Sequence, residues 1–397
     1  MIKFYFRKSI FYFLIYEIIY YFRFMETKCL NYSFAFDNSG IMTFLMALGE
    51  IFGGLIFFLI IRNSFKKTKK TDYFQIQVIK VKSSQIRKDG WTKIIILIFL
   101  AAFFDYVQFV ISEHIIFQTD DISKSINQRY YTVQILASFI ICRYVLNHIN
   151  GKHQTFSMIS MGIILVIQLI IEIIYNFGSI RFFTYLIINI FTLMLNSMTD
   201  IIEKYLGDND FTIPYMITMG EGIFVFIMNL IYSISIKNPL KQIKKFYEDL
   251  NLHDLLLLLL LFFLYIILSA IINVYKIHCN IFTSPVKRAS FHYILIPFYI
   301  IYTFQSEDDF KTNEGKQNIT FFILSEVLIV FFLILGLIYN EYIILLLVGL
   351  SKDTIHEINK RAVDVKDSMG SEYDFDRGGY GVNFNSFRNS QFDENLV

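Results

Sequence analysis

Two stretches of the chain share one pattern: SINQRYYTVQIL, residues 125–136, and SPVKRASFHYIL, residues 284–295. Ser, Arg, Ile and Leu occupy the same places in both, and each stretch opens an apolar segment. A second pair of features repeats in the same way, because the two Gly-Glu dipeptides, which end at Glu50 and Glu221, lie near the middles of two other apolar segments. Internal symmetry with polar residues at membrane depth is typical of transporters.

The composition indicates a membrane protein with several spans. Hydrophobic residues make up 55% of the 397 residues and charged residues only 18%, and the mean hydropathy is +0.50. A water-soluble chain of this length carries more charge. The formal net charge of +2 gives no basic footprint for DNA or RNA, so we expect no nucleic-acid partner. The three cysteines have no metal-ligand spacing, and we expect neither a metal site nor a cofactor.

We predict an all-α, polytopic fold with ten transmembrane helices, because a helix needs about 20 apolar residues to cross roughly 30 Å of hydrocarbon. In the first half the expected spans are about 5–25, 38–62, 92–115, 127–148 and 155–175. In the second half they are about 182–205, 212–236, 253–278, 284–304 and 319–345. Five spans in each half would make residues 1–178 and 179–349 two inverted repeats, because an odd number of spans turns the second copy over.

The positive charges predict the orientation, since Lys and Arg resist translocation. With both termini in the cytosol, the dense run of Lys and Arg between Arg62 and Lys88 faces the cytosol, and so do Lys204 and Lys276 near predicted span ends. Residues 350–397 are polar and rich in Gly, Ser, Asn and Asp, which predicts a mostly disordered cytosolic tail.

Three further stretches point to a known family: DIIEKYL, residues 200–206; Pro214 ahead of GEG, residues 220–222; and Ser284-Pro285. Together with ten spans in two inverted halves, these motifs resemble the drug/metabolite transporter superfamily and, within it, the eukaryotic nucleotide-sugar transporter-like solute carriers. The resemblance covers about residues 5–345. It implies a central cavity between the halves and a rocking motion that opens the cavity to each side in turn.

The resemblance also implies a substrate site on the fourth and ninth spans. The residues it indicates are Arg129, Tyr130, Gln134, Lys287, Arg288 and His292. Arginine binds phosphate or carboxylate bidentately, which fits an anionic substrate such as a nucleotide sugar or a phosphorylated compound. The alternative for the cations is contact with lipid headgroups, because they lie near predicted membrane edges.

Acidic residues inside predicted spans form the second candidate set: Glu50, Asp105 and Glu221. A charged side chain at the centre of a span costs about 2.5–3.5 kcal/mol on insertion scales, so such residues usually face a cavity or a partner. One interpretation is a proton-sensitive or amine-binding pair. The other is structural, with each Glu bonded to a neighbouring helix and the adjacent Gly allowing close packing. The Glu203-Lys204 pair is interpreted as a boundary contact.

The function expected from the sequence is secondary active transport of a small polar metabolite, by exchange or ion coupling, because no GxxxxGK[ST] motif for ATP occurs. The alternative is a non-transporting scaffold or receptor with the same fold. No catalytic residues are predicted, so we expect no enzyme. The expected partners are the bilayer, a small-molecule substrate and, as one option, a second copy of the chain. An endomembrane (Golgi, ER or vesicular) and the plasma membrane both remain open.

Overall fold

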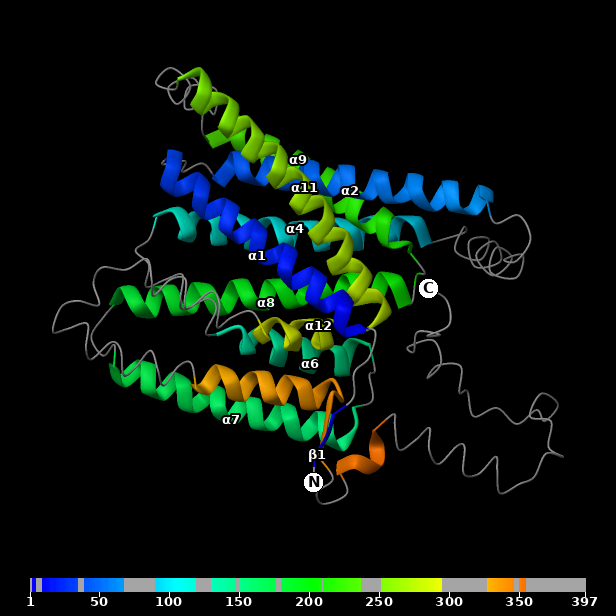
Figure 1. Ribbon diagram of the computed structural model, residues 1–397, viewed down its shortest axis with the longest axis vertical. Helices are drawn as coiled ribbons and strands as arrows, with labels where there is room; N and C mark the ends of the chain where they lie inside the picture. Colours follow the sequence, from blue (N-terminus) through cyan, green and yellow to red (C-terminus); the bar gives the residue numbers. More distant parts are fainter. Residues whose placement is uncertain are drawn as a thin grey trace. The chain divides into compact units, whose positions relative to one another are not determined.

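The structure is a computed structural model, shown in Figure 1. It describes residues 2–4, 9–34, 39–67, 90–118, 130–146, 150–175, 180–208, 210, 212–236, 251–294, 327–345 and 350–354. Predictions for the run of Lys and Arg between Arg62 and Lys88 beyond residue 67, for Arg129 and for the tail beyond residue 354 lie outside these ranges.

Helices form most of the described chain. They are α1 (Ser9–Phe34), α2 (Ser39–Lys67), α4 (Gly90–Gln118), α6 (Thr132–Val145), α7 (Lys152–Tyr175), α8 (Ile180–Asp208), α9 (Pro214–Ile236), α11 (Leu252–Phe282), α12 (Pro285–Phe291) and a further helix over Val327–Tyr339. The described chain also contains two 3₁₀ turns, η1 (His292–Ile294) and η3 (Leu350–Asp353). It has two short strands as well, β1 (Ile2–Phe4) and β2 (Ile343–Leu345).

Six of these helices are long and apolar enough to cross a bilayer: α2, α4, α7, α8, α9 and α11. They also expose large apolar side chains, and Ile163, Leu260 and Phe263 are each more than half exposed. Exposure of so many large apolar side chains is costly in water but not in the hydrocarbon of a lipid bilayer. The helices indicate an integral, multi-pass membrane protein.

The other four predicted spans are helical only in part. α1 begins and ends later than the span expected at about 5–25. α6 has 14 residues, which at 1.5 Å per residue is about 21 Å, shorter than the hydrocarbon core. α12 with η1 covers the start of the ninth span, and the remainder lies outside the described residues. Ten spans and inverted repeats therefore stay a prediction.

The chain divides into two compact units, and each contains segments from both halves of the sequence. Unit 1 comprises Met1–Phe11, Phe139–Phe177 and Val286–Val397, and unit 2 comprises Tyr12–Ser138 and Gly178–Pro285. The predicted halves at 1–178 and 179–349 are a different division of the chain.

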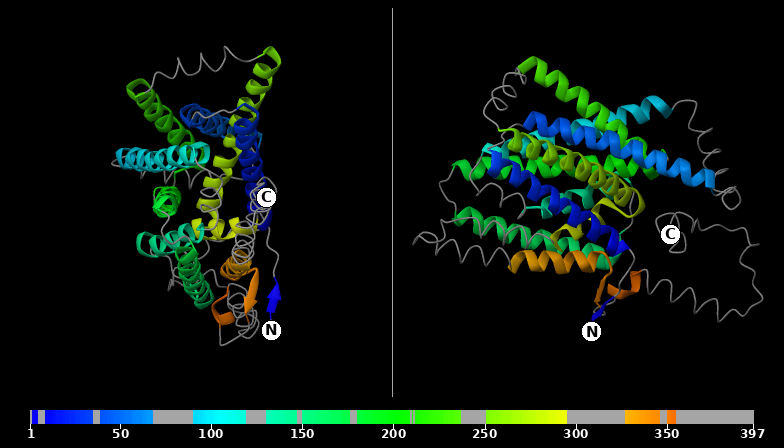
Figure 2. Two further views of the ribbon diagram at one scale, coloured as in Figure 1. Left: turned by 90° about the vertical axis from the view of Figure 1, so that its left-hand side faces the viewer. Right: turned by 45° about the horizontal axis from the view of Figure 1, so that its top comes forward.

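Unit 2 is a helical bundle in which α2 packs on both α9 and α11, and α4 packs on α8 and α9. Figure 2 shows α1 and α11 together on one side of α4 and α8. Glycines allow the closest approaches. A Cβ on Gly53 would lie 2.8 Å from the Ala270 carbonyl oxygen of α11, and one on Gly222 would lie 2.7 Å from the Cβ of Glu50. Small residues at helix contacts let backbones meet in this way.

In unit 1 the predicted span at about 319–345 does not continue as a helix, because the helix ends at Tyr339. The N–H of Tyr342 bonds the Leu337 carbonyl, and the N–H of Glu341 bonds the Ile338 carbonyl. Glu341 has φ 61°, so these bonds form the Schellman arrangement that stops a helix. The chain then enters β2, which pairs antiparallel with β1, and Ile2 lies opposite Leu345.

Candidate functional site

Polar side chains form one stripe on each of two helices in unit 2. On α8 the stripe is Asn196, Asp200 and Glu203, and on α11 it is Asn273, Lys276 and Asn280. Residues spaced three or four apart share one helix face. α8 packs against α11, so the two stripes meet. We call the following residues the acid–lysine cluster: Asp105, Gln134, Asn196, Asp200, Glu203, Lys276 and Asn280.

Lys276 is the central cation of the cluster. Its Nζ lies 3.0 Å from Glu203 Oε1, 3.6 Å from Asp200 Oδ1 and 3.9 Å from Asp105 Oδ1. The lysine is 9% exposed, and Asp200 and Glu203 are fully buried. One ammonium therefore faces three carboxylates in a site shielded from solvent, where charge interactions are stronger than in water.

Amide side chains complete the hydrogen bonding of the two α8 acids. Asn280 Nδ2 donates to Asp200 Oδ1 at 3.0 Å and to Glu203 Oε2 at 2.6 Å. Gln134 Nε2 donates to Asp200 Oδ2 at 3.1 Å, and Asn196 Nδ2 donates to Gln134 Oε1 at 3.2 Å. These bonds fix the two carboxylates in place and join α6, α8 and α11 through side chains.

Glu50 and Glu221 add two acids beside the cluster. Asn273 Nδ2, one turn before Lys276, donates to Glu50 Oε1 at 2.7 Å. Glu221 lies within Coulombic range of Glu203, Lys276 and Glu50. Both glutamates are buried, at 2% and 5% exposure. Among the described residues, Glu50 Oε2 and Glu221 Oε1 have no hydrogen-bond partner.

Three of the acids, Glu50, Asp105 and Asp200, lie deep within the helices, whereas Glu203 is five residues, or about 7.5 Å, from the end of its span. Lys93, near the start of α4, bonds Asp210 just beyond α8 at 3.0 Å, so the two helices run antiparallel there. Asp105 is twelve residues along from Lys93, or about 18 Å, and Asp200 is eight residues before the end of α8, or about 12 Å. Glu50 is ten residues from either end of its span, Gly40–Ile60, about 15 Å. For a core of roughly 30 Å these depths are near the midplane.

The predicted substrate residues have separate locations. Gln134 belongs to the acid–lysine cluster, and Tyr130 is buried at the entrance to α6, in the same unit. Lys287, Arg288 and His292 lie on α12 and η1 in unit 1. Arg288 is 2% exposed, so its side chain is surrounded by protein and does not contact lipid headgroups. Lys287 is half-buried and His292 is buried. Arg129 lies outside the described residues.

The acidic predictions Glu50, Asp105 and Glu221 all lie at or beside the cluster. The centre of the acid–lysine cluster was not predicted. Lys276 was grouped with the cytosolic charges and Glu203 with the boundary contacts, whereas both side chains are buried inside the spans Leu252–Ile281 and Phe183–Asp208. The signal was the spacing, because Asn273, Lys276 and Asn280 fall on one face, opposite an acidic face on α8.

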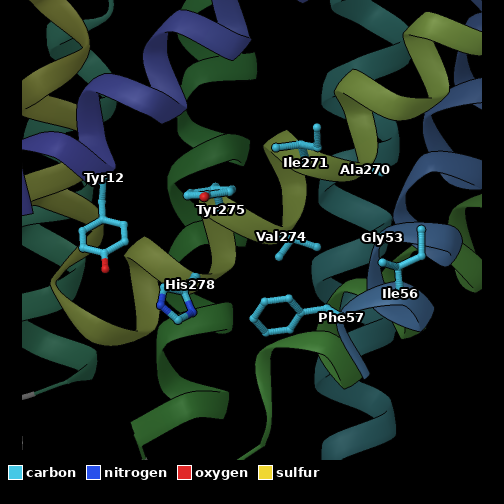
Figure 3. Close-up of a pocket in the computed structure, with 9 residues that line it drawn as sticks. All are labelled: Tyr12, Gly53, Ile56, Phe57, Ala270, Ile271, Val274, Tyr275 and His278. Atoms are coloured by element: carbon cyan, nitrogen blue, oxygen red, sulfur yellow. The ribbon is translucent and has the colours of Figure 1, made fainter. Parts of the chain in front are cut away.

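Unit 2 also contains an apolar cavity of about 320 Å³ between α1, α2 and α11. Figure 3 shows Tyr12, Phe57, Tyr275 and His278 around it, and the His278 and Phe57 rings meet edge to face at 6.3 Å. At about 100° per residue, the α11 residues of the cavity lie on the face opposite Lys276. The cavity is therefore separate from the acid–lysine cluster and lacks its charges.

Fold and site together define a multi-pass membrane protein with a buried charged centre. The chain matches no protein-family model, and no curated protein matches it.

Proposed function

We propose that the protein is a secondary active transporter of a small polar metabolite. The observation that carries this proposal is the acid–lysine cluster, whose charges lie inside the apolar spans of α4, α8 and α11. A charge at the centre of a span costs about 2.5–3.5 kcal/mol on insertion scales, and intramembrane charges usually mark a pathway or relay for a solute or ion. A purely structural bundle packs with small and apolar residues, as α2 and α11 do at Gly53.

The substrate class follows from the basic residues. Arg129, Lys287 and Arg288 supply donors for an anionic group such as a phosphate. A nucleotide sugar or a phosphorylated compound carries such a group. The surplus of acids around Lys276 disfavours binding of an anion at the cluster itself. We therefore assign the cluster to the coupling of transport to an ion, and the basic residues to recognition of the substrate.

A thermal-shift panel on the full, detergent-solubilised chain tests the proposal with nucleotide sugars, nucleoside monophosphates, phosphorylated metabolites and drug-like amines. We expect one anionic class to raise the unfolding temperature of the native chain, since a ligand that binds only the folded state stabilises it. The shift should be lost in Arg129→Ala and Arg288→Ala and kept in Lys93→Ala, whose side chain is half exposed. If no class shifts the native chain, the scaffold interpretation takes first place.

A further inference from the structure

Acids outnumber bases where the membrane helices of unit 2 meet. The acidic groups are Glu26 on α1, Glu50 on α2, Asp105 on α4, Asp200 and Glu203 on α8, and Glu221 on α9. The facing cations are Lys276 on α11 and Arg23 on α1, which lies within Coulombic range of both Glu26 and Glu50. α6 contributes the neutral Gln134. Two cations cannot neutralise six carboxylates, and an unneutralised charge is costly in this setting.

Where α2 meets α9, the surplus lies at two particular oxygens, and Glu26 on α1 has Arg23 as its own neighbouring cation. Lys276 and the amides already engage Glu203 and Asp200. Glu50 uses Oε1 to accept from Asn273, whereas its Oε2 and the Oε1 of Glu221 are fully enclosed and have no hydrogen-bond partner among the described residues. Each oxygen is therefore an acceptor that is out of reach of water and able to bind a positive group.

The two glutamates occupy adjoining positions on packed helices. Gly222, the residue after Glu221, lies against the root of the Glu50 side chain, where an added Cβ would be 2.7 Å away. The two glutamates thus belong to one short stretch of the α2–α9 contact.

A proton fits these oxygens better than a metal ion. Metal ions need several converging ligands, and Na⁺, Mg²⁺ or Ca²⁺ would each need an oxygen shell. Among the described residues no group of three or more His, Cys, Asp or Glu side chains could hold a metal ion. A proton needs one carboxylate oxygen, on which it forms an O–H bond and removes one negative charge.

We propose that Glu50 and Glu221 bind and release the proton that drives transport, and that Lys276 senses their charge. This inference rests on the proposed function and names its coupling ion. When water reaches the site, a hydronium ion gives its proton to Glu50 Oε2 or Glu221 Oε1. An O–H bond forms, a water molecule is released and that carboxyl becomes neutral. Lys276 is then drawn more strongly to Asp200 and Glu203. Loss of the proton restores the charge and pulls the ammonium back.

Infrared difference spectra of the full chain in lipid, recorded between acidic and alkaline buffer without any solute, test the proposal. We expect a protonated-carboxyl band in the native chain that is reduced in Glu50→Gln and in Glu221→Gln and reduced further in the double variant, where the remainder belongs to other buried acids such as Glu26. Glu172→Gln is the matched control, since Glu172 is a buried carboxylate of α7 in unit 1. In that control the band dependent on Glu50 and Glu221 should persist.

The band is specific to proton exchange, so its outcome is independent of whether a solute is found. A band as strong in the double variant as in the native chain overturns the proposal even if the ligand panel identifies a substrate. If the band is reduced as expected while no compound in the panel binds, the result supports proton exchange and argues against a metabolite as the substrate. If Glu221→Gln fails to fold, Glu221→Asp keeps a carboxyl group, and its band should shift in frequency; an unshifted band in Glu221→Asp also contradicts the proposal.

Discussion

Lys276 and Lys93 show how differently one side-chain type can behave within a single unit. Lys93 is half exposed and bonds Asp210 and Tyr205 at the end of α8. Lys276 is enclosed and faces three carboxylates. Exposed pairs contribute little, whereas breaking a buried one leaves charge uncompensated.

Lys276→Met should therefore destabilise the protein strongly, by about 3–5 kcal/mol, the range seen when one partner of a buried pair is removed. Lys93→Met should cost under about 1 kcal/mol. Thermal unfolding of both variants in the same detergent measures the difference. Equal unfolding temperatures would mean that Lys276 is not the counter-ion of the α8 acids.

Residue types were predicted better from the sequence than residue partners. Glu50, Asp105 and Glu221 were chosen because charge inside a span is costly, and all three lie at or beside the cluster. Lys276 was assigned to the cytosolic side because it is near the end of its apolar run. Its burial could not be predicted from that run, since α11 continues to Phe282, six residues beyond the lysine.

At the scale of elements, the glycines next to the two glutamates behave differently despite their matched positions. A Cβ on Gly49 would meet the Ile266 carbonyl oxygen at 2.7 Å, a backbone contact between α2 and α11. A Cβ on Gly220 would meet only the Ile98 side chain, at 2.8 Å. In the second half the backbone contact belongs to Gly222 instead. The structural interpretation of the glycines is thus confirmed for Gly49, and the sequence repeat does not specify which glycine makes the contact.

Gly222→Ala should separate α9 from α2, because the new methyl group meets the Ala47 carbonyl oxygen at 2.9 Å as well as Glu50. Overpacking of this kind costs about 1–3 kcal/mol. Gly220→Ala is the matched control, since a side chain can adjust where a backbone cannot. The comparison needs only the unfolding temperatures of the two variants, and a larger loss for Gly220→Ala would contradict the assignment.

At the scale of the whole molecule, length and hydropathy predicted six helices well. The bounds of α2, α4, α7, α8, α9 and α11 each agree within a few residues with an expected span, except where a helix continues past the apolar run. The span expected at 319–345 was wrong beyond Tyr339, because Glu341 adopts a left-handed conformation that hydrophobicity does not reveal. Its buried carboxylate lies 3.1 Å from His153 Nε2, a contact distant in sequence.

The topology yields a prediction for the intact protein. Ten spans would place both termini on one side of the membrane, which the positive charges predict to be the cytosol, so tags at the two ends should become accessible to antibody together when only the plasma membrane is permeabilised. An odd number of spans would leave one tag protected. The outcome depends on the span count and not on transport.

The glycines of α2 have a consequence for motion. Gly49 and Gly53 bring the helix backbone against α11, Gly54 brings it against α9, and Asn229 of α9 also bonds the Gly40 carbonyl at 2.8 Å. Because its backbone contacts α11 on one side and α9 on the other, no layer of deformable side chains separates α2 from these helices at the glycines, and α2 cannot easily slide past them. The three helices should therefore move as a single rigid body, with any hinge located outside them.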